Sequence, residues 1–561
     1  MHMPYETNPK TYTITAALPY ANGPIHIGHL AGVYIPADIY ARYLRSKGHR
    51  VLFVSGSDEH GVPITIRAQQ QKISPQGLVD KYHQLNREAL EALGISFDVF
   101  ARTSSAQHHQ TAAAFFSTLY QKGALTAYDT EQYYDNTCQQ FLPDRYIRGA
   151  CPKCAYAEAY GDQCEACGTA LSPEDLLAPR SILSDAQPVR KKTKHWYLAL
   201  EAYAPWLKQW ILEENTAWKA NVYSQCKAWL DQGLRPRAIT RDLSWGVPVP
   251  LPDADQKVLY VWFDAPIGYI SATQTWAAER QVDWEPFWKD PKTQLIHFVG
   301  KDNIVFHCIM FPTMLKAHGG FILPHNVPAN AFLNLHGDKI STSRNRAVWL
   351  PEYLTDFAGK QDVLRYVLCS NAPENKDSDF TWPDFQAKNN HELVAIVGNF
   401  VHRTLVLVHK HFQGKVPERM NLTHFDQAIL EKVRGVPTRI GDAIEEYRFR
   451  DALQHWVDLA RLGNKYLSDT TPWHSVKVAI EPVQTVLNIA LQLVGNMAVL
   501  GTPFLPFTSQ RLRDMLGITD TTWPIQGDTA VLHAGQQLQP PVLLFERIAD
   551  EVIQEQVERY T

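Results

Sequence analysis

A strand, a helix and a second strand follow one another near the start of the chain, and this order constrains the fold most. Residues 11–18 alternate in polarity and are rich in β-branched side chains, which is typical of a strand. After a break at 19–24, a helix is predicted from His26 to Lys47, where Gly48 ends it. Residues 51–54 then predict a short buried strand. This order begins a parallel doubly wound sheet, which binds ligands at the carboxyl ends of its strands.

The chain changes character several times along its 561 residues, which are too many for a single core. The apolar runs 258–263 and 294–299 predict further strands, so the α/β domain resumes after an interruption. The expected segments are a Rossmann-type catalytic domain, first half (1–122), a cysteine-bearing insertion (123–245), the second half of the catalytic domain (246–338), a connector (339–390) and an all-helical bundle (391–561).

The composition limits the location and the partners of the protein. The net charge is −4, so the chain as a whole lacks the excess of basic residues that is typical of nucleic-acid-binding proteins. Binding of an RNA would therefore need a local basic surface. The N-terminus lacks the pattern of a secretory signal. The longest apolar stretch, 490–507, is interrupted by polar residues and predicts a buried helix instead of a membrane span. We therefore expect a cytoplasmic protein with reduced cysteines and no membrane partner.

Four of the eight cysteines have the spacing of a metal site. Cys151 and Cys154 form one Cys-x-x-Cys turn, and Cys164 and Cys167 form a second. Each turn offers two thiolates, so the two together complete the tetrahedral coordination of one zinc ion. No coordination position is left for a substrate, so the zinc would be structural. The alternative is a group of reduced, unligated thiols; the remaining cysteines are isolated and are interpreted as ordinary apolar residues.

Two short motifs have the chemistry of nucleotide binding. His26 and His29 are three residues apart at the start of the predicted helix, so they lie on one side, beside backbone N–H groups that favour anions. Gly28 leaves room for a flat base or ribose. Much later, residues 339–343 read Lys-Ile-Ser-Thr-Ser, a basic loop rich in hydroxyls. The alternative for the first motif is a pair of surface histidines in a helix cap, but the two motifs in this order predict a triphosphate held from both sides.

Longer motifs carry a resemblance to one family. They are Ala17-Leu-Pro-Tyr-Ala-Asn-Gly-Pro-Ile-His-Ile-Gly-His29, Gly56-Ser-Asp-Glu-His-Gly61, Val261-Trp-Phe-Asp-Ala-Pro-Ile-Gly-Tyr269 and Gly300-Lys-Asp-Asn-Ile-Val-Phe-His307. With the nucleotide motifs, they resemble the class I aminoacyl-tRNA synthetases, and among them the methionyl-tRNA synthetase family, through nearly the whole chain. The resemblance implies a Rossmann domain split by a zinc-bearing insertion, a stem-contact fold at 339–390 and an anticodon-binding bundle.

The resemblance also implies roles at the substrate site. Asp58 would bind the substrate ammonium, with Arg241 as a counter-charge that keeps this carboxylate ionised. The catalytic residues would be His26, His29 and Lys339. The ATP site would comprise His26, His29, Gly300, Asp302, Lys339, Thr342 and Arg344. The methionine site would comprise Leu18, Tyr20, Asp58, Arg241, Trp262, Ala265, Pro266, Tyr269 and His307. Aromatic rings suit a polarizable thioether, whereas without the surrounding motif Trp262 and Tyr269 would be interpreted as core aromatics at strand ends.

By the same resemblance, three residues of the bundle would read the anticodon. Asn399 and Arg403 are four residues apart and share a helix face, and Trp473 lies further along. An exposed indole beside amide and guanidinium donors suits the stacking and edge recognition of unpaired bases. The alternative is that Trp473, which follows a proline, caps the core of the bundle.

Two departures from the family pattern affect the expected chemistry. The family's loop is commonly Lys-Met-Ser-Lys-Ser, and here Thr342 replaces the second lysine, which leaves Lys339, Arg344 and Arg346 as the nearby cations. Some members carry a second zinc knuckle, whose expected positions here hold Asp135, Cys138, Ser181 and Ser184. That set is a poor zinc ligand, so one zinc per chain is predicted.

The resemblance implies that the chain activates L-methionine with ATP and Mg²⁺, and then transfers it to tRNA(Met), including the initiator tRNA. Synthetases for leucine, isoleucine or valine share the nucleotide motifs but carry a long editing insertion, which is missing here. A cysteine enzyme would be expected to use zinc in its pocket, and the four cysteines leave no ligand position free. A synthetase-like RNA-binding protein without activity would not need His26, His29 and Asp58. No further dimerisation domain is recognised, so a monomer is expected.

Overall fold

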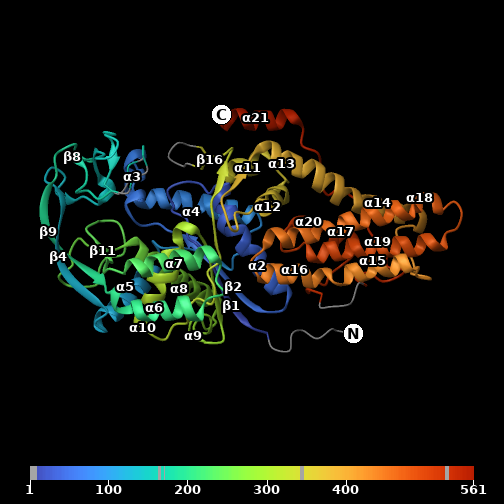
Figure 1. The fold of residues 1–561 in the computed structure, drawn as a ribbon, viewed down its shortest axis with the longest axis horizontal. Coiled ribbons are helices and arrows are strands. Elements are labelled where there is room, and N and C mark those ends of the chain that lie inside the picture. Colours follow the sequence, from blue (N-terminus) through green and yellow to red (C-terminus); the bar gives the residue numbers. More distant parts are fainter. Residues whose placement is uncertain are drawn as a thin grey trace.

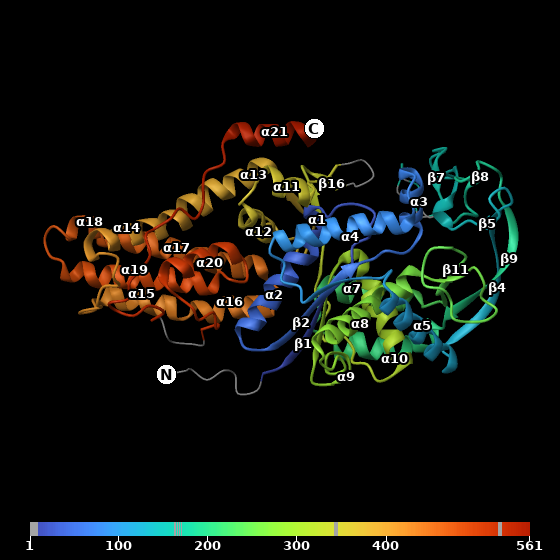
Figure 2. The same cartoon turned by 180° about the vertical axis from the view of Figure 1, so that it is seen from behind.

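The computed structural model describes residues 9–524 and 530–560, except 162, 163, 165, 168, 170 and 341–345. The molecule is elongated, with the parallel sheet and the insertion at one end and the helical bundle at the other (Figure 1). Turning the molecule by 180° shows the same division, and the chain end with α21 lies above the middle of the molecule (Figure 2).

The central sheet has five parallel strands in the order β14-β13-β1-β2-β3. The strands are β1 (Thr11–Ala16), β2 (Arg50–Ser57), β3 (Val99–Arg102), β13 (Gln294–Gly300) and β14 (Ala329–Asn330). The strands predicted at 11–18, 51–54 and 294–299 are therefore confirmed. Chain progress reverses on either side of β1, so the carboxyl ends of β1, β2 and β13 surround a topological switch point.

Helices cover both faces of this sheet. They are α1 (Ile27–His29), α2 (Ile35–Ser46), α4 (Pro75–Ala92), α5 (Ala106–Gln121), α8 (Val261–Arg280), α9 (Pro286–Lys289) and α10 (Phe311–His318), while α3 (Val62–Gln71) packs on α4 beside the insertion (Figure 1). The helix predicted from His26 to Lys47 is continuous, with a π-helical turn at Leu30–Tyr34 that joins α1 to α2.

The strand predicted at 258–263 is wrong for most of its length. Only β12 (Val258–Leu259) is a strand, and it pairs antiparallel with β11 (Thr240–Arg241) outside the central sheet. From Val261 the chain is α8, whose residues are buried on nearly all sides. A short apolar run does not distinguish a buried strand from the first turns of a buried helix, because neither has a polar face.

The insertion contains two small antiparallel sheets at the far end of the molecule (Figure 1). Its long β4·β9 ladder leads to a separate sheet in the order β7-β6-β8, which carries the clustered cysteines. The remaining elements are β4 (Leu125–Asp135), β5 (Gln140–Phe141), β6 (Ile147–Ala150), β7 (Ala159–Tyr160), β8 (Leu177–Ser181), β9 (Val189–Leu198), β10 (Arg237–Ala238), α6 (Ala204–Lys208) and α7 (Ala220–Gln232).

A small mixed unit connects the catalytic sheet to the bundle. It contains β15 (Leu333–Leu335), β16 (Asp338–Lys339), β17 (Ser378–Phe380), α11 (Leu350–Asp356), α12 (Gln361–Ser370) and α13 (Trp382–Ala387). The bundle and tail contain α14 (Asn399–Phe412), α15 (His424–Arg434), α16 (Val436–Glu445), α17 (Phe449–Thr470), α18 (Pro472–Ser475), α19 (Glu481–Leu500), α20 (Pro506–Leu516) and α21 (Asp550–Tyr560). The domain boundaries expected from the sequence remain a prediction.

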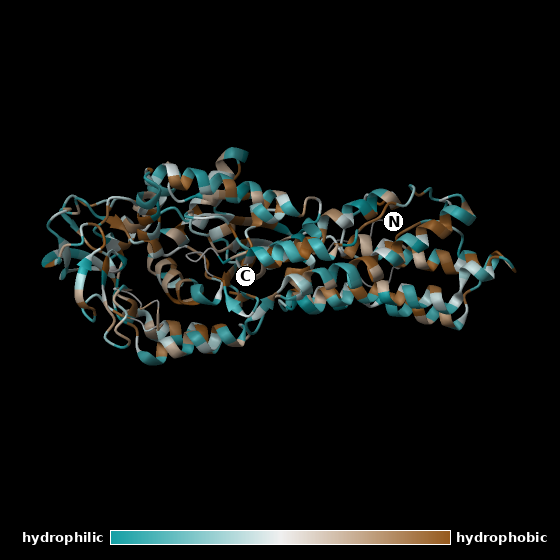
Figure 3. Cartoon of the chain, turned by 90° about the horizontal axis from the view of Figure 1, so that it is seen from above, coloured by the Kyte–Doolittle hydropathy of each residue, from teal (hydrophilic) through white to brown (hydrophobic). Residues whose placement is uncertain are grey.

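Within the described residues, two helical stretches are long and apolar enough to cross a membrane, Trp382–Phe412 and Glu481–Leu500. In the second, 94% of the apolar window is buried inside the protein, so the buried helix expected near 490 is confirmed. In the first, the buried share is 39%, and its apolar side chains pack into the bundle core. Figure 3 shows that hydrophilic and hydrophobic residues alternate along the helices of the bundle end of the molecule.

A buried ion pair joins the three main parts of the chain. Arg365 on α12 donates to Asp38 Oδ2 on α2 at 2.7 Å, and both side chains are fully buried. The same guanidinium donates to the carbonyls of Pro503 and Phe504 in the bundle, at 3.0 and 2.9 Å. Burial alone would raise the pKa of Asp38, but Arg42 and Arg365 lower it to about 2. This one buried ion pair therefore contacts the catalytic domain, the connector and the bundle.

Replacing Arg365 by Met should destabilise the protein by about 3–5 kcal/mol, because Asp38 would lose a buried counter-charge that its remaining partners do not replace. Urea unfolding measures this loss. The matched control is Arg461→Met, which breaks an exposed pair with Asp458 and should cost less than about 1 kcal/mol. Equal costs for the two variants would contradict a central role for the Arg365 pair.

Candidate active site

His26 and His29 lie at the start of α1, at the carboxyl end of β1. Their rings stack with centroids 3.8 Å apart. His26 Nδ1 accepts a hydrogen bond from the Gly28 backbone N–H at 3.1 Å, and His29 Nδ1 accepts one from the His26 N–H at 3.3 Å. Because both Nδ1 atoms accept, the proton of each neutral ring lies on Nε2. The two histidines thus cap the helix with one nitrogen and keep an N–H donor on the other.

Burial keeps both imidazoles neutral. It lowers the pKa of His26 well below its ordinary value, with a further contribution from His29, and it lowers the pKa of His29 to about 4. At neutral pH the pair therefore offers two N–H donors beside the positive end of a helix and carries no charge of its own. Such an arrangement can bind phosphate oxygens by hydrogen bonding, and a separate cation has to supply the charge.

Ile340, which follows Lys339, lies against this histidine motif. A side chain at Gly28 would come within 3.2 Å of Ile340 and 3.0 Å of the His26 ring. The space at Gly28, expected to admit a base or ribose, is therefore filled by His26 and Ile340 in this structure. Lys339 lies near enough to Asp302 to lower the pKa of that carboxyl, although burial raises it overall. Thr342 and Arg344 lie outside the described residues.

The ATP residues predicted at the end of β13 lie close to one another. Gly300 ends the strand, and a side chain there would come within 2.6 Å of Asp302 Oδ1. The adjacent Lys301 forms an ion pair with Asp377, with Nζ and Oδ1 2.6 Å apart. The absence of a side chain at Gly300 therefore leaves room for the Asp302 carboxylate at the switch point.

Asp58 is buried at the end of β2, with 3% of its surface exposed. Its backbone is held by the Pro19 carbonyl and the Ala21 N–H, each at 2.8 Å, and its Oδ1 accepts from the His60 N–H at 3.3 Å. Burial, followed by repulsion from Asp264, raises the pKa of Asp58 well above its ordinary value. A cation bound here would favour the ionised carboxylate.

The role expected of Arg241 beside Asp58 stays a prediction. Its guanidinium lies over the Tyr260 ring at 3.9 Å and donates to the carbonyls of Ala238 and Thr240, at 3.2 and 2.8 Å. Arg241 makes these contacts while burial and Asp264 raise the pKa of Asp58. The short β11·β12 pairing holds Arg241 beside Tyr260, a placement that depends on the tertiary structure.

The predicted side-chain pocket is assembled from β1, α8 and the segment after β13. Tyr269 and His307 form a hydrogen bond of 2.9 Å, in which the Tyr269 hydroxyl donates because His307 uses its other nitrogen to donate to the Asn303 carbonyl. Burial lowers the pKa of His307 to about 4. Tyr20 meets Trp262 edge to face at 6.5 Å. These aromatic groups are neutral and suit an apolar, polarizable ligand.

The other predicted pocket residues lie on the same elements. Ala265, Pro266 and Tyr269 are buried on α8, and Trp262 on the same helix is half-buried. Leu18 follows β1 and lies close to Gly268, at which an added side chain would come within 3.3 Å of the leucine. Contacts with Gly268 thus bring the end of β1 against α8.

Two aromatic residues of this region were missed by the sequence reasoning. Phe306 stacks on Trp262 with centroids 3.8 Å apart and nearly parallel rings. His297 on β13 lies 5.6 Å from the Tyr269 ring and bonds to Thr15 Oγ1 at 2.6 Å. Phe306 belongs to the quoted motif at 300–307, so its position in that motif was the available signal. His297 lies inside a strand with no comparable signal.

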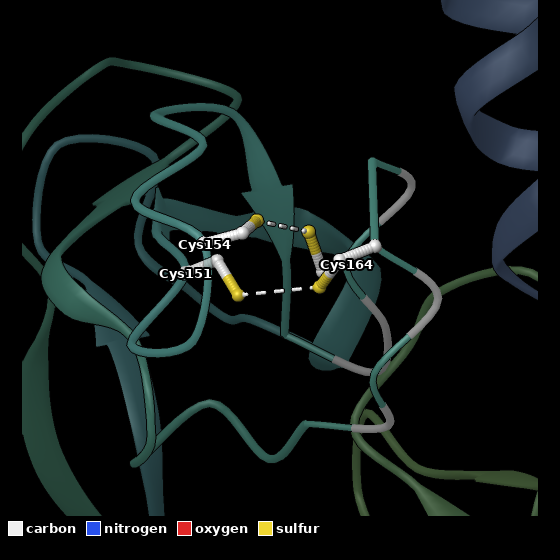
Figure 4. Close-up of side chains that lie close together, drawn as sticks. Cys151, Cys154 and Cys164 are labelled. Carbon is white, nitrogen blue, oxygen red and sulfur yellow. Dashed lines mark hydrogen bonds between the residues drawn. The ribbon is translucent and has the colours of Figure 1, made fainter.

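The four clustered cysteines come together as the sequence predicts. Cys151 and Cys167 sulfurs are 3.8 Å apart, and those of Cys154 and Cys164 are 3.6 Å apart, with all four within 4.8 Å (Figure 4). Four thiolates around zinc, at about 2.3 Å from the ion, would be separated by about 3.8 Å. The residues therefore fit a tetrahedral metal ion.

The positions of the second knuckle are joined by hydrogen bonds. Asp135 Oδ1 accepts from the backbone of Thr137 and Cys138, at 2.8 and 3.1 Å, and its Oδ2 accepts from Ser184 Oγ at 2.6 Å. Although burial opposes it, hydrogen bonds from Ser181 and Ser184 lower the pKa of Asp135 to about 2. One carboxylate thus connects these positions by accepting hydrogen bonds.

The three predicted anticodon residues lie on one part of the bundle. The Arg403 guanidinium lies over the Trp473 ring at 4.8 Å, and Asn399 is exposed one turn earlier on α14, where it donates to Asn464 at 3.3 Å. Trp473 is half-buried and packs on the core with one part of its ring. Trp473 therefore has an accessible part, as stacking on a base requires, and a part packed on the core, as a core cap requires.

Family comparisons agree with this geometry. Residues 12–405 match the family model described as tRNA synthetases class I (M), and residues 416–561 match that of the anticodon binding domain of methionyl tRNA ligase. A methionine–tRNA ligase from Cytophaga hutchinsonii is 59% identical over 98% of this chain and 81% of its own length. The enzyme from Bacteroides fragilis is also 59% identical, over 99% of this chain and 81% of its own.

Solved structures share the same fold. Mycobacterium tuberculosis methionyl-tRNA synthetase bound by methionyl-adenylate has a TM-score of 0.79 at 23% identity, covering 96% of this chain and 100% of that one. Its free form has a TM-score of 0.71 at 22% identity, over 97% and 100%. The predicted α/β fold with a split parallel sheet and a C-terminal helical domain is confirmed. On the family models and the close relatives, the chain belongs to the methionine–tRNA ligase family of class I aminoacyl-tRNA synthetases.

Proposed function

We propose that the protein activates L-methionine with ATP to methionyl-adenylate and then transfers the methionyl group to tRNA(Met), including the initiator tRNA. The observation that carries this proposal is the position of Asp58. Its buried carboxylate forms no ion pair with an arginine among the described residues, and it lies near Tyr269 on α8, at the sheet edge where α1 begins with the histidine pair. An α-amino acid with an apolar side chain matches this combination of groups.

The substrate's orientation follows from these groups. The ammonium pairs with Asp58, which becomes the ionised partner of a buried ion pair. The thioether side chain lies among Tyr20, Trp262, Tyr269 and His307, of which the last two are hydrogen-bonded to each other. The carboxylate is then left to point toward the nucleotide at the ends of β1 and β13.

Activation is a displacement at phosphorus. A carboxylate oxygen of methionine attacks the α-phosphorus in line, the bond to the bridging oxygen breaks, and pyrophosphate leaves with its electron pair. Nε2–H groups of His26 and His29 donate to the phosphate oxygens, and Lys339 supplies positive charge as charge grows on the leaving group. ATP enters as its Mg²⁺ complex, the usual substrate form.

The second step transfers the acyl group to RNA. A hydroxyl of the terminal tRNA ribose attacks the carbonyl carbon of the adenylate, and AMP leaves. In this proposal Asn399, Arg403 and Trp473 bind the anticodon at the far end of the bundle. The elongated molecule separates these two sites and suits an RNA that contacts both (Figure 1).

The remaining expectations belong to the same proposal. The four-cysteine cluster holds zinc as a structural ion that orders the β7-β6-β8 sheet, and the protein acts as a monomer in the cytoplasm. Arg241 stays a proposed methionine-site residue only if it leaves Tyr260 when the substrate binds.

Methionine-dependent pyrophosphate exchange tests the function. Methionine should drive rapid exchange, whereas leucine and isoleucine should be much slower, because their branched side chains do not match a pocket for an unbranched thioether. Lys339→Ala should reduce the rate by about 10²–10³-fold, the scale of one lost transition-state donor. Faster exchange with leucine or isoleucine would show that the substrate is wrong.

Metal analysis should find about one zinc per chain, because only one cluster has four thiolates at tetrahedral spacing. Cys164→Ser should lose most of this zinc. Cys138→Ser is the matched control and should keep it, because Cys138 belongs to the hydrogen-bonded positions around Asp135. Two zinc ions per chain, with one lost in the Cys138 variant, would mean that the second knuckle binds metal.

Trp473→Ala should weaken aminoacylation of tRNA by about 1–3 kcal/mol in kcat/KM and leave methionine-dependent pyrophosphate exchange unchanged, because a base stack is lost far from the active site. Phe425→Ala, at another exposed ring of the bundle, is the control and should preserve both activities. A parallel loss of both activities in the Trp473 variant would favour its role as a core cap.

A further inference from the structure

A second buried carboxylate lies behind Asp58 and is not used by the proposed mechanism. Asp264 is on the first turns of α8, between the pocket residues Trp262 and Ala265, and it is fully buried. Its charge is the largest electrostatic contribution to the raised pKa of Asp58 after burial. Two carboxylates this close repel each other, so the arrangement is costly unless a cation is bound nearby.

His60 holds Asp264 in place, and His108 lies beside it. His60 Nδ1 lies 2.6 Å from Asp264 Oδ2, and His108 Nε2 on α5 lies 3.7 Å from the same oxygen, beyond hydrogen-bond distance. His108 Nδ1 is 3.0 Å from Ser271 Oγ, which itself donates to the Gly268 carbonyl on α8. All three members of this His60–Asp264–His108 cluster are buried.

The cluster connects the ammonium site to the side-chain pocket. The backbone N–H of His60 donates to Asp58 Oδ1, while the ring of the same residue bonds to α8 through Asp264. The turn after β2 and the pocket helix are therefore coupled by one residue. They come from the two halves of the catalytic domain, which are separated in sequence by the whole insertion.

We propose that the His60–Asp264–His108 cluster is a positioning element for the substrate ammonium: it holds the turn that carries Asp58 against α8 and places a second negative charge behind that carboxylate. The proposal rests on the assignment of Asp58 in the proposed function. The negative potential of two carboxylates favours a ligand cation over a neutral ligand of the same shape. Selectivity for a free α-ammonium would therefore depend on residues that never contact the substrate.

The three side chains also have the composition of a metal site, since their ligand atoms lie within 4.8 Å of one another. The geometry favours a hydrogen-bonded cluster. A separation of 2.6 Å between His60 Nδ1 and Asp264 Oδ2 is that of a short N–H···O bond. Ligand atoms around a tetrahedral zinc, at bond lengths of 2.0–2.1 Å, would be about 3.3 Å apart.

The test compares ligands with and without the ammonium, by calorimetry on the full chain. The ligands are L-methionine, L-methioninol, which keeps the ammonium, and 4-(methylsulfanyl)butanoate, which lacks it. Asp264→Asn should weaken both ammonium ligands by about tenfold or more, the effect of about one pKa unit or more of electrostatic interaction. Binding of the butanoate and the KM for ATP should change less than twofold.

Variants of His60 test the positioning part independently and also serve if Asp264→Asn does not fold. His60→Leu should raise the KM for methionine by a similar factor with kcat nearly unchanged. His60→Asn keeps a donor near the Nδ1 position and should restore most of the affinity. Asp426→Asn removes a buried carboxylate from the bundle, where it accepts from Thr423, and should leave methionine binding unchanged.

Each outcome separates the possible explanations. Equal weakening of all three ligands by Asp264→Asn would mean that the cluster only supports packing, and unchanged binding of all three would mean that it has no role; either result overturns the proposal. Loss of a second metal ion in the same variant would identify a metal site and also overturn it. If the unmodified protein failed to bind methionine at all, the proposed function itself would fail, whatever the variants do.

Discussion

One buried ion pair connects the main parts of the protein along its length. Asp38 and Arg365 are far apart in sequence, and the arginine also reaches the backbone of the bundle through Pro503 and Phe504. A buried pair of this kind is costly to break but adds little net stability over an apolar contact, so its value lies in specifying geometry. Here it specifies how the bundle is oriented relative to the catalytic sheet, and hence the relation between the proposed anticodon and adenylate sites.

Burial also sets the chemistry of the site, because it decides which groups are charged. His26, His29 and His307 are all neutral, and their tautomers are set by backbone hydrogen bonds. They can orient phosphate oxygens or a tyrosine hydroxyl but supply no charge. In the proposed function, Lys339 supplies charge for the phosphates, and Asp58, near Asp264, becomes charged when it pairs with the ammonium. Neutral donors and localised charges are thus kept on different elements around the switch point.

Two groups of residues in the insertion are held together by different interactions. At Cys151 to Cys167, four sulfurs stand at the spacing of a tetrahedral metal ion. At Asp135 to Ser184, one carboxylate accepts hydrogen bonds from backbone and hydroxyl groups. The second arrangement needs no metal to satisfy its polar groups.

The sequence by itself determined the parallel sheet, the cysteine cluster and the nucleotide motifs. Each depends on local spacing: alternation along β1, two Cys-x-x-Cys turns, and two histidines three residues apart. Only the tertiary structure decided what long-range packing controls. It turned the apolar run at 258–263 into the start of α8, placed Arg241 over Tyr260, and brought Asp264, His60 and His108 together. His60 and Asp264 are 204 residues apart and leave no local pattern, because their contact exists only once the two halves of the sheet have joined.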